Sequence, residues 1–152
     1  MKLKLFEILT ELIDLYSIED MESKGITYKI DSENARRLVV YLSYKKTYYA
    51  IRILPVFNPK RPSINFGSAN EQFRNLNFTT LTTSIYSSHI LAVIFSFVRY
   101  WVDKYNVQEF EYGADGHTRQ QLYTYYLEKH FQDFTPSVEK FGSADIFVWT
   151  KK

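Results

Sequence analysis

The spacing of hydrophobic and polar positions along the chain predicts an order of secondary-structure elements. Residues 3–17 place apolar side chains every three or four positions with acids opposite them, which is the pattern of an amphipathic helix. Short runs rich in β-branched and aromatic residues then predict three strands, over 26–30, 36–44 and 48–57. Lys45 and Lys46 fall between the last two runs, so we expect these two strands to form a hairpin.

Three prolines follow the predicted hairpin, at Pro55, Pro59 and Pro62. Because proline lacks the backbone N–H that the interior of a sheet requires, this segment is expected to be an edge strand or a loop. A short strand over 64–66 is compatible with the pattern.

The second half of the chain begins with a helical pattern over 82–105, which Thr83 or Ser84 could cap. A strand, a helix and two closing strands are predicted after it, over 107–114, 117–131, 134–138 and 144–150. The expected fold is one α+β domain over 1–152, with a mixed, mainly antiparallel sheet and about three helices in the order α-β-β-β-α-β-α-β-β. Its parts are an N-terminal helix, a basic strand region, a central helix and a strand-helix-strand-strand unit, over 1–17, 26–66, 82–105 and 107–150.

Composition supports a globular protein and narrows the chemistry. Of the 152 residues, 45% are hydrophobic and 24% are charged, close to the averages for folded domains. The absence of cysteine excludes disulfides and thiolate nucleophiles. Acids interrupt the N-terminal apolar positions, and the longest apolar run, over 90–98, is too short to span a membrane. We therefore expect a cytoplasmic protein without membrane contact, in a bacterial cell or a phage-infected host.

Aromatic residues are abundant, at 18% with 13 Tyr and 12 Phe. Such a load can fill a core with few residues, and tyrosines whose hydroxyls stay hydrated can build a binding surface. Codon bias in an AT-rich genome explains the same excess equally well.

The order of elements from Arg36 to Thr150 resembles that of the acyl-CoA N-acyltransferase superfamily, the GNAT fold. The helix that begins 118-TRQQLYTYYLEKHF-131 is similar to the family's helix with an Ala-x-x-Leu-Tyr pattern, and Phe131 stands near the phenylalanine that closes it. The resemblance implies that Tyr123 would protonate a departing thiolate, with acetyl-CoA or another acyl-CoA as the cofactor. Against this role, an aromatic stripe at helical spacing is usually part of a core.

The family's pyrophosphate loop is rich in glycine, because bare backbone N–H groups at a helix N-terminus hold the phosphates. In this chain the corresponding segment, 77-NFTTLTTSIYSS-88, has no glycine. Hydroxyls of Thr82, Thr83 and Ser84 would have to bind the phosphates instead. This departure favours a protein that uses no cofactor.

Glu109 and Glu111 alternate along one predicted strand, so both carboxylates project to the same face. In an acyltransferase either could deprotonate an amine through water, and in the simpler interpretation they solvate an exposed face. Asp115 and His117 could form a metal or acid–base pair, but no second cluster supplies further ligands. Asp115 is better explained as a helix cap, so no metal site is predicted.

Charge is unevenly distributed, although the net charge is only +2. Ten of the 19 basic residues and two of the 17 acidic residues fall within 36–104. The basic residues predicted to bind a partner are Arg36, Arg37, Lys45, Lys46, Arg52, Lys60, Arg61 and Arg74. Aromatic residues alternate with them, as in proteins that bind single-stranded nucleic acid. A protein partner with an acidic surface would need the same charges, and a solvated hairpin face is the third interpretation.

The sequence thus favours a small GNAT-like binding or accessory protein without catalytic activity, which engages a protein partner through its basic, aromatic-rich region. The first alternative is an N-acyltransferase that uses acyl-CoA, with Tyr123 as acid and Glu109 or Glu111 as base. The second is a single-stranded nucleic-acid binder.

Overall fold

A computed structural model describes residues 14–69, 88–113 and 117–152, apart from the side chains of 88, 117–120 and 122. Within these ranges the chain forms a seven-stranded sheet, two α-helices and two short 3₁₀ helices. In chain order the elements are η1 (Ile18–Asp20), η2 (Glu22–Lys24), β1 (Ile26–Asn34), β2 (Arg37–Tyr44), β3 (Thr47–Pro55), β4 (Pro62–Ala69), α2 (Ser88–Tyr105), β5 (Glu109–Gly113), α3 (His117–His130), β6 (Phe134–Phe141) and β7 (Ala144–Lys151).

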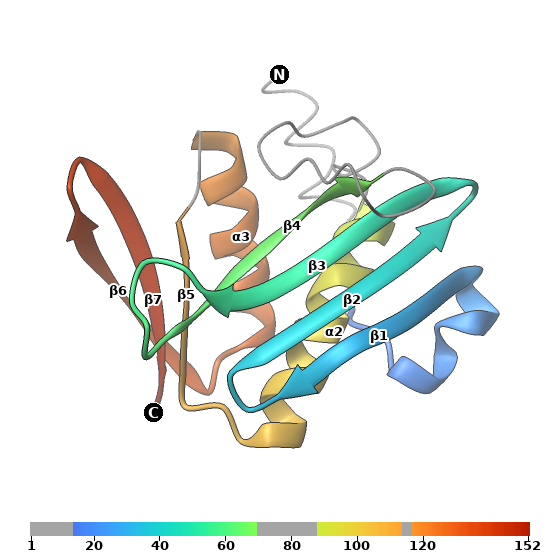
Figure 1. Cartoon of the computed structure of the whole chain (residues 1–152), viewed down its shortest axis with the longest axis horizontal. Coiled ribbons are helices and arrows are strands. Elements are labelled where there is room, and N and C mark those ends of the chain that lie inside the picture. Colours follow the sequence, from blue (N-terminus) through green and yellow to red (C-terminus); the bar gives the residue numbers. More distant parts are fainter. Residues whose placement is uncertain (1–13, 70–87, 114–116) are drawn as a thin grey trace.

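The strands lie in the order β1-β2-β3-β4-β5-β7-β6 (Figure 1). All neighbours are antiparallel except β4 and β5, which are parallel. These two strands pair in register at one position, where Ser63 faces Glu111. We refer to this junction as the seam, because it joins the β1–β4 half of the sheet to the β5–β7–β6 half.

Both helices pack on one face of the sheet, behind the strands in Figure 1. The centre of α2 is apolar apart from Ser96, and residues 91–98 are buried without interruption. Ring contacts join the helices to the strands: Phe97 of α2 lies 5.1 Å from Tyr28 of β1, and Phe131 after α3 lies 5.9 Å from Phe110 of β5. The core therefore lies between this face and the helices.

Most predicted elements are confirmed. The hairpin of β2 and β3 turns at Lys45 and Lys46, the strand–helix order after α2 holds, and β6 and β7 meet at a turn that contains Gly142 with φ 63°. The predicted helix over 3–17 falls mostly outside the described residues, and residues 14–17 are not helical. The first six residues of the predicted helix over 82–105 also fall outside them.

The prediction around the three prolines was wrong in part. Residues 62–69 form a full strand, β4, which is internal to the sheet because it lies between β3 and β5. Pro62 begins this strand and pairs with Pro55 at the end of β3. Proline is tolerated there because a strand end does not need the missing N–H. The fold is thus α+β with a mixed, mostly antiparallel sheet, but with four strands before α2 where three were expected and two described α-helices where about three were expected.

The loop between β3 and β4 folds across the face of the sheet opposite the helices. Its Phe57 ring lies against Phe141 of β6 with centroids 5.3 Å apart, and it also covers Gly113 at the end of β5. A Cβ at Gly113 would lie 2.8 Å from Phe57 Cε2 and 3.1 Å from Ile146 Cδ1. Glycine at this position therefore permits the loop to approach the strand closely.

We predict that Gly113→Ala lowers the free energy of unfolding by about 1–3 kcal/mol, because the added methyl group overpacks this contact. Urea denaturation of Gly113→Ala, Phe57→Ala and the double variant measures the effect. Since removal of the ring makes room for the methyl group, the double variant should lose less stability than the two single losses together. Additive losses would contradict the proposed contact.

Candidate functional site

The largest cluster of charged side chains among the described residues lies at the seam, around Arg61. The Arg61 side chain donates hydrogen bonds to Glu111 at 2.6 Å, to Glu109 at 2.8 Å and to Glu139 at 2.5 Å. These three acids come from β5 and β6, whereas Arg61 immediately precedes β4. The Arg61 side chain is 8% exposed and that of Glu111 is 0% exposed, so this ion pair is buried.

The protonation of the cluster follows from its burial and its excess of acids. Burial opposes the charge of Arg61, but hydrogen bonds to its three acids outweigh burial and raise its pKa above the usual value. Burial raises the pKa of Glu111, although Arg61 acts in the opposite direction. The other oxygen of Glu111, Oε2, and the hydroxyl of Ser63 are buried without a hydrogen-bond partner among the described residues. One cation therefore serves three carboxylates, and the most buried carboxylate is the hardest to ionise.

Glu109 and Glu111 do share a face of β5, as their alternation predicts. The interpretation that both simply solvate an exposed face is wrong for Glu111, which is fully buried. Arg61, which the sequence places among partner-binding residues, lies in this cluster. Its side chain hydrogen-bonds to acids on β5 and β6 and so joins the start of β4 to these strands.

Tyr123 lies inside the core under the seam and is 3% exposed. Its ring centroid is 4.9 Å from Phe66 of β4 and 4.9 Å from Tyr112 of β5, so it bridges the two strands. Phe95 of α2 closes the group at 6.0 Å. Aromatic rings thus occupy the helix side of the seam.

The remaining predicted partner-binding residues do not all lie in one patch. Arg36 reaches the carbonyl of Pro59 at one end of the sheet, near Lys60. Lys45 and Lys46 lie at the opposite end, in the turn of the β2–β3 hairpin. The predicted residues Arg74, Thr82, Thr83 and Ser84 fall outside the described residues.

Several of the cations share the side of β1–β3 that faces away from the helices. Ile51 and Ile53 point into the core, so the side chain of Arg52 between them points to the other side. We define the basic face as this side of β1–β3 together with the hairpin turn. Its cations are Lys29, Arg37, Lys45, Lys46 and Arg52, and Asp31 is the one acid among its described residues.

Lys29 is a member of the basic face that sequence reasoning missed. A signal for it exists, because it alternates with Tyr28 and Ile30 in the run 26-ITYKI-30. Those two neighbours pack against the core, so the lysine between them must face the other way.

The turn at Lys45 and Lys46 is strained. Their φ angles are 49° and 63°, so both residues are left-handed, as the central pair of a type I′ turn requires. Asparagine followed by glycine is the usual pair there, because other residues lose roughly 1–2 kcal/mol each in this conformation. Two lysines therefore occupy positions where their backbone is unfavourable.

His89 lies close to this turn and to its positive charges. Its ring lies 4.6 Å from the Tyr44 ring, and its Nδ1 is 2.8 Å from the Tyr16 hydroxyl. Burial lowers the pKa of His89, and the charges of Lys45 and Lys24 lower it further. Lys45 and Lys24 therefore place positive charge beside this ring.

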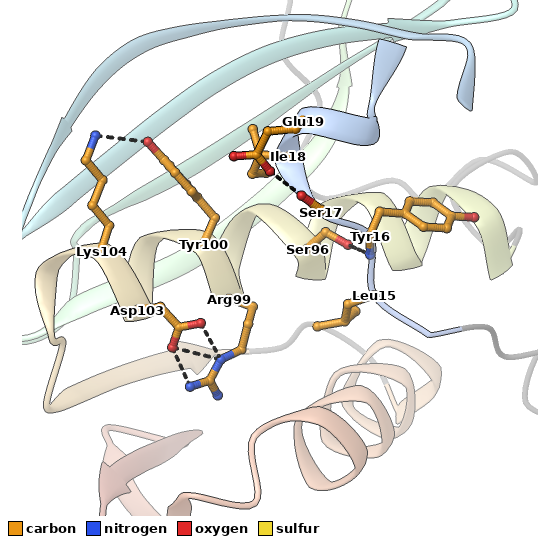
Figure 2. A pocket seen from close by; sticks show the side chains of 10 residues that line it. All are labelled: Leu15, Tyr16, Ser17, Ile18, Glu19, Ser96, Arg99, Tyr100, Asp103 and Lys104. Carbon is orange, nitrogen blue, oxygen red and sulfur yellow. Dashed lines mark hydrogen bonds and ion pairs between the residues drawn. The ribbon is translucent and has the colours of Figure 1, made fainter. Parts of the chain in front are cut away.

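A separate hollow of about 420 Å³ lies between the segment before β1 and α2 (Figure 2). Its lining residues are Leu15, Tyr16, Ser17, Ile18, Glu19, Ser96, Arg99, Tyr100, Asp103 and Lys104. Each cation there already has a carboxylate partner. Arg99 pairs with Asp103 and Asp133, and Lys104 pairs with Glu33. The hollow therefore offers a ligand no uncompensated positive charge among its lining residues.

Two features are absent from the described ranges. These ranges contain no group of three or more His, Asp or Glu side chains placed to hold a metal ion. None of their helices combines the length and apolar character that a bilayer crossing requires.

We predict that Arg61→Met lowers the free energy of unfolding by about 3–5 kcal/mol, because it leaves Glu111 buried without its cation. Arg61→Met combined with Glu111→Leu should recover most of the loss, since it removes the buried charge as well. Lys140→Met is the control, because the Lys140–Asp145 pair is exposed and should contribute less than about 1 kcal/mol. Chemical denaturation measures all three. Equal losses from Arg61→Met and Lys140→Met would contradict the role assigned to the cluster.

The resemblance suggested by the order of elements has no counterpart in comparisons with known proteins. Models of protein families, curated protein sequences and solved structures each gave no match to this chain.

Proposed function

We propose that the chain is a small binding module with a GNAT-like core, which holds an anionic macromolecule against its basic face without catalysing a reaction on it. The observation that carries this proposal is the strained turn. Lys45 and Lys46 keep two positive charges at positions where Asn-Gly would be more stable. Backbone strain that stability does not explain is a sign of function.

The charges of the basic face support the same proposal. Five cations and one acid give its described residues a net charge of +4, compared with +2 for the whole chain. A field of one sign attracts an oppositely charged partner and accelerates its association. The acidic surface of a protein partner and a nucleic acid both meet this requirement.

The alternative of an acyl-CoA-dependent N-acyltransferase requires Tyr123 to reach a thioester. The order of α2, β5, α3, β6 and β7 after the β2–β3 hairpin suits that alternative, because the resemblance to the family rests on this order. Against it, Tyr123 is almost fully buried between Phe66 and Tyr112, where a pantetheine arm would need space. We therefore prefer binding without catalysis.

The double variant Lys45→Asn/Lys46→Gly tests the binding proposal. It should raise the free energy of unfolding by about 1 kcal/mol, because it relieves left-handed strain. The same variant should elute from immobilised heparin, a generic polyanion, at lower salt than the original chain.

The control Lys129→Gln/Lys152→Gln removes the same charge from exposed positions in the other half of the molecule. It should elute later than the turn variant. If the two variants elute together, the charge of the basic face has no special role and the proposal is wrong.

We predict that acetyl-CoA leaves the melting temperature unchanged at millimolar concentration. A cofactor at a hundred times its Kd would add roughly 2.7 kcal/mol, which is several degrees for a domain of this size. Differential scanning fluorimetry with and without acetyl-CoA makes the comparison, and free adenosine diphosphate serves as the control ligand. A rise of several degrees with acetyl-CoA alone would restore the acyltransferase alternative.

A further inference from the structure

Two tyrosines stand close together on the basic face. Tyr41 of β2 pairs with Ala50 of β3, and Tyr48 of β3 pairs with Ser43 of β2. The two tyrosines are therefore diagonal neighbours across the strand pair, roughly 7–8 Å apart at the backbone. Small side chains occupy the other two corners of this square, so the rings border a depression.

A hollow of about 440 Å³ lies beside the two rings, mainly over β1 and β2. Its lining residues are Thr27, Tyr28, Lys29, Asp31, Tyr41, Ser43 and Tyr48. The volume lies within the roughly 300–1,000 Å³ of typical small-ligand sites, which is enough for a planar ring.

Cations lie on both sides of the tyrosine pair. Lys29 is directly opposite Tyr41 in the β1–β2 register. Along the strands, at roughly a right angle to this pairing, the turn begins at Lys45, four positions beyond Tyr41, which is about 13 Å at the rise of a strand. The face therefore carries a bent row of side chains: Lys29, the two tyrosine rings and then the two lysines of the turn.

The chemistry of this row distinguishes between anionic partners. Every nucleobase has a flat aromatic face that stacks on tyrosine, and its phosphate pairs with lysine. An acidic protein segment would use the cations but leave the two rings without a role. In a duplex the bases are stacked on one another and cannot reach the rings, so the row suits a single strand.

We infer that the basic face binds single-stranded nucleic acid, with bases stacked on Tyr41 and Tyr48 and phosphates held by Lys29 and the Lys45–Lys46 turn. This inference rests on the proposed function, which it narrows to one class of partner. The two tyrosines supply contact that does not depend on base sequence, so we expect little sequence preference.

Fluorescence anisotropy with labelled oligonucleotides of about 12 nucleotides tests the inference, a length within the range that such sites occupy. The single-stranded probes are DNA and RNA of mixed sequence. The competing probes are the same sequence as a duplex and a polyglutamate peptide of equal charge. Single strands should bind more tightly than either competitor.

Substitutions separate stacking from charge. Tyr48→Leu should weaken binding of the single strand roughly 5-fold to 100-fold, whereas Tyr48→Phe, which keeps the ring, should bind like the original chain. Lys45→Asn/Lys46→Gly should reduce the slope of log affinity against log salt by about 0.7 for each phosphate that the variant no longer neutralises. Tyr125→Leu is the matched control, because Tyr125 is an exposed tyrosine on α3. It should change neither quantity.

The outcomes separate this inference from the proposed function. If polyglutamate binds and the single strand does not, the basic face binds an anion of another class and the inference is wrong while the proposed function stands. If the duplex binds as tightly as the single strand, or if Tyr48→Phe weakens binding as much as Tyr48→Leu, stacking is not the basis of recognition. If no probe binds and heparin does not retain the chain, both proposals are wrong.

Discussion

The ion cluster around Arg61 is the interaction on which the arrangement of the sheet depends. The β4 and β5 strands pair in register at one position, so backbone hydrogen bonds alone join the two halves weakly. Arg61 reaches from the start of β4 to two acids on β5 and a third on β6. It thereby ties the two halves together through side chains. The buried part of this cluster requires the cation, because a buried carboxylate without a partner is strongly destabilising.

The seam has a second support on the side of the helices. Tyr123 of α3 contacts rings from both strands and from α2, so the same helix closes the seam that Arg61 clamps from the other side. A catalytic residue must be accessible to its substrate, whereas a residue that completes a core must be buried. The burial of Tyr123 satisfies the second requirement, so this tyrosine completes the core.

The sequence predicted the elements well because their signals are local. Alternation in 36–44 and 48–57, helical spacing after 88, and glycine between the last two strands each act over a few residues. The strand β4 was underestimated because its prolines were read as interruptions, and their places at strand ends depend on which strands become neighbours. The role of Arg61 was missed for a related reason. Its acids lie 48, 50 and 78 positions away in sequence, and local patterns do not show which distant charges meet.

The basic block of the sequence therefore divides into two kinds of cation with different physical costs. Arg61 is dehydrated and must be neutralised, so its charge does not attract a partner. The cations of the basic face remain at the surface, and the protein accepts backbone strain at Lys45 and Lys46 to keep them there. The basic face also contains Lys29, which lies outside the basic region 36–104 of the sequence. Lys29 joins the face because side chains alternate between the two sides of β1. Which charged residues lie on one face of a sheet thus depends on the alternation of side chains along each strand. Which charged residues meet at the seam depends on the order of the strands in the sheet. This is why a count of basic residues predicts that a basic surface exists but not which residues belong to it.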